Sequence, residues 1–355
     1  MRELYLHIGL PKTGTSSIQR RLAQNAEPLL AAGIGLGPYI DPADGESRRM
    51  RLAIREQGIG PVMSRLAASP AEKLVVSSEH LSAAMLDCRI AEAVRDAARR
   101  HFTPRIIVFL RRQDYWKESV FAQVVKNWYS GDIQNRALVD YDLDRQVADL
   151  EAVFGRENVI VRIYQDAHDD VLATFFAILG VGVPPVGRGE NDRQNVSLHR
   201  RKVLFLSRVP KPDPMIQDVS TFMTRVVTGS RWIADDGIRF LMSPQERHAL
   251  VARHLEGNRA LVARHGIRDA GSFAELPDPD AAWQPPAPIS RAEFLAVAAE
   301  AQVSSFTTFK SRYSLRMAGK LARMLPQLAG RLFSPAPWPP SVPPPLDLLP
   351  IADLD

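Results

Sequence analysis

One lysine and a group of small, hydroxyl-bearing side chains lie near the start of this 355-residue chain. The run from Lys12 continues through residues that could all bind an anion, namely Thr13, Gly14, Thr15, Ser16 and Ser17. The first N–H groups of a helix have no partner within the helix, and the helix dipole is positive at that end. A helix that begins here would therefore bind a phosphate or a sulfate ester, with Lys12 adding a full charge.

A strand pattern precedes this loop and a helix pattern follows it. Leu4, Leu6 and Ile8 alternate with more polar residues, as in a buried strand, and Ile18 begins an apolar helix face. The stretch is therefore predicted to fold as a strand, a loop of small residues and a helix. A Walker loop would carry its lysine after the second glycine, whereas Lys12 comes three positions before that place.

Two further apolar runs end in residues that could do chemistry. The run 73–78 is followed by Glu79 and His80, and the run 104–110 is followed by Arg111. The carboxyl ends of parallel strands form the binding edge of an open sheet, so these side chains are expected near the loop. A carboxylate or an imidazole there could act as a general base, with Glu79 favoured and His80 as the alternative.

Strand and helix patterns alternate over roughly the first 180 residues, which predicts an α/β fold with a parallel sheet covered by helices on both faces. The expected strands cover 4–8, 73–78, 104–111 and 158–164, whereas 31–51 is expected to be a loop that ends in a helix. An α/β domain is predicted for 1–290 and a helical, basic extension for 291–333. The proline-rich tail 334–355 is expected to be extended and disordered.

Two of these stretches resemble motifs of the sulfotransferases that use 3′-phosphoadenosine 5′-phosphosulfate (PAPS). The stretch Pro11-Lys-Thr-Gly-Thr-Ser16 resembles their 5′-phosphosulfate loop. In their 3′-phosphate motif, an arginine at a strand end is followed eight residues later by a serine on a helix. Arg111 and Ser119 have that spacing, with Arg112 as the alternative contact. The resemblance implies a P-loop-like three-layer domain with a central parallel sheet and a helical C-terminal region.

The resemblance also implies an activity and a set of roles. PAPS would bind through residues 12–17, Arg111, Ser119 and, on a later basic loop, Arg193. Lys12 would stabilise the leaving group, and Glu79 or His80 would deprotonate a hydroxyl or amine of the acceptor. The favoured acceptor is a carbohydrate or a glycolipid, and no metal is required. The alternatives are a P-loop small-molecule kinase and a non-catalytic nucleotide-binding scaffold.

Composition limits the other possibilities. The net charge of +5 indicates anionic ligands, but no nucleic-acid-binding motif is present. The single cysteine excludes an internal disulfide and favours a reducing compartment. No apolar run reaches about 18 residues, so no membrane span is predicted and a cytoplasmic location is expected. The segment 310–331 contains Lys and Arg without Asp or Glu. It predicts either a basic amphipathic helix on the inner membrane face or a packed terminal helix.

Overall fold

A computed structural model of the chain contains a five-stranded parallel sheet. The structure describes residues 1–39, 48–79, 81, 85, 88–127, 131–134, 142–164, 171–185, 198–209 and 224–308. The strands are β1 (Arg2–Ile8), β2 (Ile34–Leu36), β3 (Lys73–Ser78), β4 (Phe102–Leu110) and β5 (Val159–Ile163), in the order β2-β3-β1-β4-β5. The predicted α/β class with a parallel central sheet is therefore confirmed.

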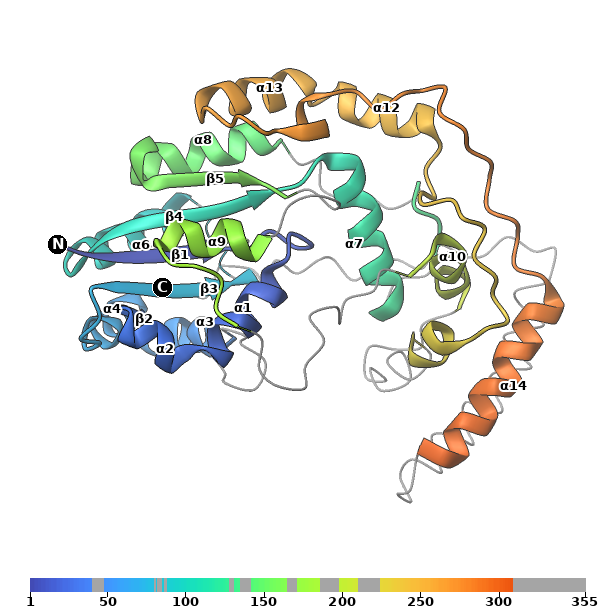
Figure 1. The fold of residues 1–355 in the computed structure, drawn as a ribbon, viewed down its shortest axis with the longest axis horizontal. Helices are drawn as coiled ribbons and strands as arrows, with labels where there is room; N and C mark the ends of the chain where they lie inside the picture. Colours follow the sequence, from blue (N-terminus) through green and yellow to red (C-terminus); the bar gives the residue numbers. More distant parts are fainter. Residues whose placement is uncertain are drawn as a thin grey trace.

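Helices cover both faces of this sheet (Figure 1). On one face lie α1 (Thr15–Gln24), α2 (Ala26–Ala31) and α9 (Val171–Leu179). On the other face lie α3 (Arg48–Gln57), α4 (Ile59–Ala67), α6 (Cys88–Arg99), α8 (Leu143–Phe154) and α13 (Leu255–Arg264). Further helices with described bounds are α7 (Gln113–Asn127), α10 (Arg200–Arg208), α12 (Pro244–Ala252) and α14 (Arg291–Thr308), with short 3-10 turns at Arg156–Asn158 and Gly271–Ala274.

The alternation of side chains along each strand divides the core into two layers. Leu4 and Leu6 of β1 pack with the helices of the larger layer, whereas Tyr5 packs with α1 and α9. Both faces of the central strands are apolar, as expected for a parallel sheet that is covered on both sides.

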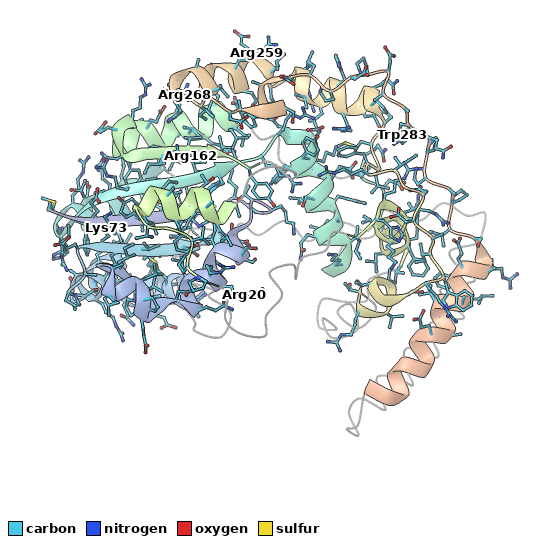
Figure 2. All side chains as sticks on the ribbon, viewed as in Figure 1. Arg20, Lys73, Arg162, Arg259, Arg268 and Trp283 are labelled. Atoms are coloured by element: carbon cyan, nitrogen blue, oxygen red, sulfur yellow. The ribbon has the colours of Figure 1, made fainter. Side chains whose placement is uncertain are left out.

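Helix α7 leaves the carboxyl end of β4 and belongs to a third apolar cluster beside the sheet (Figure 1). Phe121 of α7 packs there with Phe205 of α10 and Phe294 of α14. Figure 2 shows Trp283 on the extended segment that precedes α14, and its indole Nε1 donates a hydrogen bond to the carbonyl oxygen of Phe240 at 3.0 Å. Residues 291–300 therefore share a core with α7 and α10.

The structure differs from the sequence predictions in three places. The segment 31–51 contains the edge strand β2, in which a Cβ on Gly35 would lie 2.7 Å from Ala71 Cβ. Close packing requires glycine at this position. Because glycine is disfavoured in strands, the residue pattern of 31–51 did not predict β2. Ile18, Leu22 and Leu29 predict one helix after the loop, but α1 ends at Gln24, where Asn25 Nδ2 donates to the carbonyl oxygen of Arg21, and Leu29 belongs to α2. The pattern of the sequence over 244–265 predicts one helix, but the structure has two there, α12 and α13.

The sequence predicts a helix over 142–154 and another from 244 with Ser243 as its cap, and the structure confirms both helix starts. Asp142 accepts a hydrogen bond from the backbone N–H of Arg145 at the start of α8, and Ser243 forms a capping box with Glu246 at the start of α12. The basic segment 310–331 and the tail 334–355 lie outside the described residues, and the helix predicted from 291 is described as far as 308.

Candidate anion-binding site

The loop between β1 and α1 has an unusual backbone. Helix α1 begins after Gly14, which is left-handed with φ 84°, and Lys12 has φ 69°. Among the described residues, Lys12 is the one non-glycine residue with a positive φ. This conformation is disfavoured for a residue with a Cβ, and such strain is characteristic of functional sites.

Two threonines shape the loop from the inside. Thr13 is buried and its Oγ1 donates to the carbonyl oxygen of Leu10 at 2.7 Å. Thr15 is also buried, and a Cβ on Gly9 would lie 2.3 Å from its Oγ1. Both threonine side chains therefore support the loop, while the predicted donors Ser16 and Ser17 are exposed and half-buried, respectively.

The N-terminus of α1 has the features of an anion site. No side chain caps this end, and its first turn contains no acidic residue. The N–H groups of Ser17 and Ile18 both donate to the carbonyl oxygen of Gly14, at 3.0 and 3.2 Å. Left-handed residues at such a turn can form a nest of backbone N–H groups, which favours an anion together with the helix dipole.

The carboxyl end of β3 lies beside this loop. Ile8 of β1 pairs with Ser78 of β3, and the N–H of Gly9 donates to the carbonyl oxygen of Ser78 at 3.3 Å. Glu79 follows directly and is exposed. Burial lowers the pKa of Lys12, the charge of Glu79 acts to raise it, and the charge of Arg111 lowers it further. Three strand ends thus place charges within electrostatic reach of one ammonium group.

Arg111 supports the same loop from β4. Its Nη1 donates to the carbonyl oxygen of Lys12 at 3.1 Å, and its guanidinium carbon lies 5.4 Å from the ring centroid of Tyr164. Gly14 packs on that ring as well, since a Cβ there would lie 3.2 Å from Tyr164 Cε2. Arg111, Tyr164 and the loop therefore form one packed unit at the carboxyl edge of the sheet.

The neighbouring Arg112, by contrast, is buried and makes its hydrogen bonds inside the protein. Its Nε and Nη2 donate to the two carboxylate oxygens of Asp114 at 2.7 and 2.9 Å. Its Nη1 donates to the carbonyl oxygen of Ser272 at 2.7 Å. All three guanidinium nitrogens of this buried side chain are thus engaged, which leaves Arg111 as the arginine at the candidate site.

Helix α7 carries the predicted residue Ser119 and also Lys126, which the sequence did not single out. Ser119 is half-buried on α7, eight residues after Arg111. Lys126 lies seven residues further, which is two helical turns and therefore the same face. Burial and the charge of Lys12 lower the pKa of Lys126. The helical spacing from Ser119 was the signal that could have identified this lysine.

Two of the predicted site residues, His80 and Arg193, lie outside the described residues. The sequence also offers three aromatic residues that could face a sugar, and two of them, Trp128 and Tyr129, likewise lie outside the described residues. Trp116, the third such aromatic, is buried. Within the described ranges, no three His, Cys, Asp or Glu side chains gather as metal ligands would, and no helix is long and apolar enough to span a bilayer.

A cavity of about 620 Å³ opens elsewhere, between α7, α10 and the segment before α14. Its walls include Phe121, Phe205, Trp283 and Phe294, so it is lined by members of the third apolar cluster. None of the predicted site residues that the structure describes borders it, and the charged loop is therefore the better candidate for the binding of an anion.

Comparison with known proteins provides little further guidance. A protein of Archaeoglobus fulgidus (strain ATCC 49558 / DSM 4304 / JCM 9628 / NBRC 100126 / VC-16), described as an uncharacterized protein, is 28% identical over 108 residues. The match covers 30% of this chain and 30% of that protein's length. No family model matches the chain, and no solved structure matches it significantly.

Proposed function

We propose that this chain is a sulfotransferase that moves the sulfuryl group of PAPS to a hydroxyl or amine of an acceptor, with a carbohydrate or glycoconjugate as the favoured class. One observation carries the proposal. Lys12, Glu79 and Arg111 follow β1, β3 and β4, which are neighbours in the sheet, and the charges of Glu79 and Arg111 both act on Lys12. An anion site, a candidate base and a second cation thus meet at one edge.

The donor set fits a nucleotide with two anionic ends. The N-terminus of α1, Lys12 and the hydroxyls of Ser16 and Ser17 suit the 5′-phosphosulfate, so the strand-loop-helix unit would act as a P-loop-like cradle. Arg111 and Ser119 suit the 3′-phosphate, because a guanidinium and a hydroxyl give charge-assisted hydrogen bonds to its oxygens.

Each residue then has a chemical task. Bound PAPS supplies a sulfur atom whose bond to the bridging phosphate oxygen breaks as its bond to the acceptor forms. Lys12 stabilises the electron pair that stays on the bridging oxygen. Glu79 accepts the proton of the acceptor hydroxyl or amine. Positioning and charge stabilisation dominate such in-line transfers, so the residues present suffice without a metal.

The kinase and scaffold alternatives receive less support from the residues. A Walker loop needs a lysine at the place where Thr15 stands, and the buried Thr15 side chain packs on Gly9 instead. A non-catalytic scaffold would have no need of an exposed carboxylate beside the loop lysine.

Calorimetric titration with adenosine 3′,5′-bisphosphate, run beside Mg-ATP, tests the proposal. We expect metal-independent binding of the bisphosphate. We expect Lys12→Ala and Arg111→Ala each to weaken it by about tenfold or more, because each variant loses a charge-assisted contact. Arg162→Ala, which removes an exposed arginine of β5, is the matched control and should bind as the unmodified protein does.

The other outcomes decide between the alternatives. Binding of Mg-ATP in place of the bisphosphate would support a kinase. Binding of neither ligand would refute the proposal. Binding of the bisphosphate with sulfuryl transfer unaffected by Glu79→Gln would remove Glu79 as the base and leave His80.

A further inference from the structure

The cavity between α7, α10 and the segment before α14 is large enough to hold a small molecule. Its volume of about 620 Å³ lies within the range of small-molecule sites, roughly 300–1,000 Å³. A water molecule occupies about 30 Å³ in the liquid, and a methylene group is of similar size. The cavity therefore has room for a chain of about a dozen carbon atoms.

The walls of this cavity are mostly apolar. Their buried part is formed by three phenylalanines of the third apolar cluster, Phe121 of α7, Phe205 of α10 and Phe294 of α14. The segment before α14 adds Trp283, which Figure 2 labels, and three prolines within 285–288. Apolar surface that leaves water to contact such walls stabilises a complex in proportion to its area.

Polar side chains in the walls are already hydrogen-bonded within the protein. Ser207 Oγ donates to the carbonyl oxygen of Leu204 at 2.8 Å, and Gln134 Nε2 donates to Glu246 Oε1 at 3.2 Å. A sugar would have to give up hydrogen bonds to water on entering, which costs free energy unless the protein replaces them. An alkyl chain has no such requirement, so the walls suit an alkyl chain better than a sugar.

One ion pair lies at the solvent-exposed part of the wall. Arg208 Nη2 lies 2.6 Å from Asp132 Oδ1, and the two side chains are 46% and 42% exposed. Helix α10, which ends at Arg208, contains four cationic residues and no acidic one. A guanidinium group has five N–H donors, so Arg208 can bind a carboxylate and still contact Asp132.

We propose that this cavity binds a fatty acid, with the alkyl chain between α7, α10 and the segment before α14 and the carboxylate at Arg208. The site is separate from the candidate anion site. Phe121 follows Ser119 by two residues, or about 200° around α7, so the two side chains leave nearly opposite sides of the helix. The inference does not rest on the sulfotransferase proposal.

A series of chain lengths tests the inference on the unmodified protein. Octanoate, decanoate and dodecanoate are titrated by calorimetry below the concentrations at which they form micelles. We expect the affinity to rise about fourfold for each added CH₂ group, because each group is removed from water. Dodecyltrimethylammonium, with a chain of the same length and a cationic head, should bind more weakly than dodecanoate. Absence of dodecanoate binding, equal affinities along the series, or equal affinities for the two head groups would overturn the inference.

Variants of the wall locate the ligand. Ile289→Trp and Leu204→Trp each place a larger side chain in the wall, and each should weaken dodecanoate binding by about tenfold or more, because the added ring takes the space of several methylene groups. Leu295→Trp, at an exposed position of α14 that does not border the cavity, is their control. Arg208→Gln should weaken binding about two- to fivefold, as for an exposed ion pair, and Arg162→Gln should not.

The outcome in the two tryptophan variants is decisive if either variant unfolds cooperatively on heating. Full affinity for dodecanoate in such a variant would place the ligand elsewhere and overturn the inference. If neither variant folds, the chain-length series on the unmodified protein decides.

Discussion

At the scale of single residues, the anion loop depends on the absence of a side chain at Gly9. A Cβ there would lie 2.3 Å from Thr15 Oγ1 and 2.5 Å from Thr15 Cγ2, far inside van der Waals contact. Thr15 is the first residue of α1 and is buried, so it cannot turn away into solvent. Gly9 therefore sets how closely the end of β1 approaches the N-terminus of α1.

Gly9→Ala should distort this contact. We expect it to lower the free energy of unfolding by about 1–3 kcal/mol, as overpacking does, and to weaken the binding of adenosine 3′,5′-bisphosphate. Urea unfolding and calorimetry measure the two effects. Adding Thr15→Ala, which deletes Oγ1 and Cγ2, should restore part of the lost stability and part of the lost affinity. Gly60→Ala in α4, where a Cβ meets nothing within 4 Å, is the control. An unchanged affinity in Gly9→Ala would contradict the assigned role of the loop.

At the scale of elements, a buried histidine joins β1 to β3. His7 is fully buried, its Nδ1 lies 2.8 Å from Ser77 Oγ, and its ring makes T-shaped contacts with the rings of Phe109 and Phe175. Its Nε2 makes no hydrogen bond with any described residue. Burial lowers the pKa of His7 from 6.5 to about 3, so the imidazole is neutral in the folded protein.

This histidine predicts a pH dependence of stability. The folded pKa lies below the unfolded one, so the unfolded state binds the proton more readily. Above about pH 6.5 His7 therefore does not reduce the free energy of unfolding. Below that pH its protonation in the unfolded state lowers the free energy of unfolding by about 1.4 kcal/mol per pH unit, until the folded pKa of about 3 is reached.

The variant His7→Leu isolates this contribution. It should be about 1 kcal/mol less stable at pH 7, because the contact with Ser77 is lost. Between pH 6 and pH 5 its stability should fall less steeply than that of the unmodified protein, by about 1.4 kcal/mol per unit. Urea unfolding across that range compares the two slopes. Equal slopes would show that His7 takes up its proton in the folded state without penalty.

At the scale of the whole molecule, one carboxylate ties distant segments to the start of α7. Asp114 is fully buried and accepts hydrogen bonds from Arg112 and from Arg247 of α12, the latter at 2.6 Å. Burial would raise the pKa of Asp114, but the hydrogen bonds and charges of both arginines hold it below its usual value. Arg112 also donates a hydrogen bond from Nη1 to the carbonyl oxygen of Ser272. The helix that carries Ser119 and Lys126 is thereby fixed to the C-terminal part of the described chain.

Asp114→Asn should be strongly destabilising. It removes the negative charge and leaves Arg112 and Arg247 buried without compensation, which costs about 3–5 kcal/mol in comparable sites. Thermal and urea unfolding measure the loss. Asp280→Asn, which neutralises an exposed carboxylate, is the control and should change stability little. A small effect in Asp114→Asn would mean that water reaches the two arginines and that the network does not fix α7.

The sequence by itself determined the parts of this protein that depend on local pattern. Four of the five strands, the start of α1 within residues 15–17, the start of the helix at Asp142 and the cap Ser243 follow from periodicity and from helix-entry residues close in the chain. The parallel α/β class follows from the alternation of these elements. The short strand β2 was not predicted, because the glycine at Gly35 is required by close packing on Ala71, a residue distant in the sequence.

Only the tertiary structure decided how the charged groups divide their tasks. Arg111 and Arg112 are adjacent and alike in sequence, yet one meets the Lys12 loop and the other is buried against Asp114. The inward turn of Thr13 and Thr15, and the effect of the Lys12 charge on the pKa of Lys126, likewise depend on which elements the fold brings together. A pattern of residue types records spacing along the chain, whereas the partner of a charge depends on which segments the fold brings together.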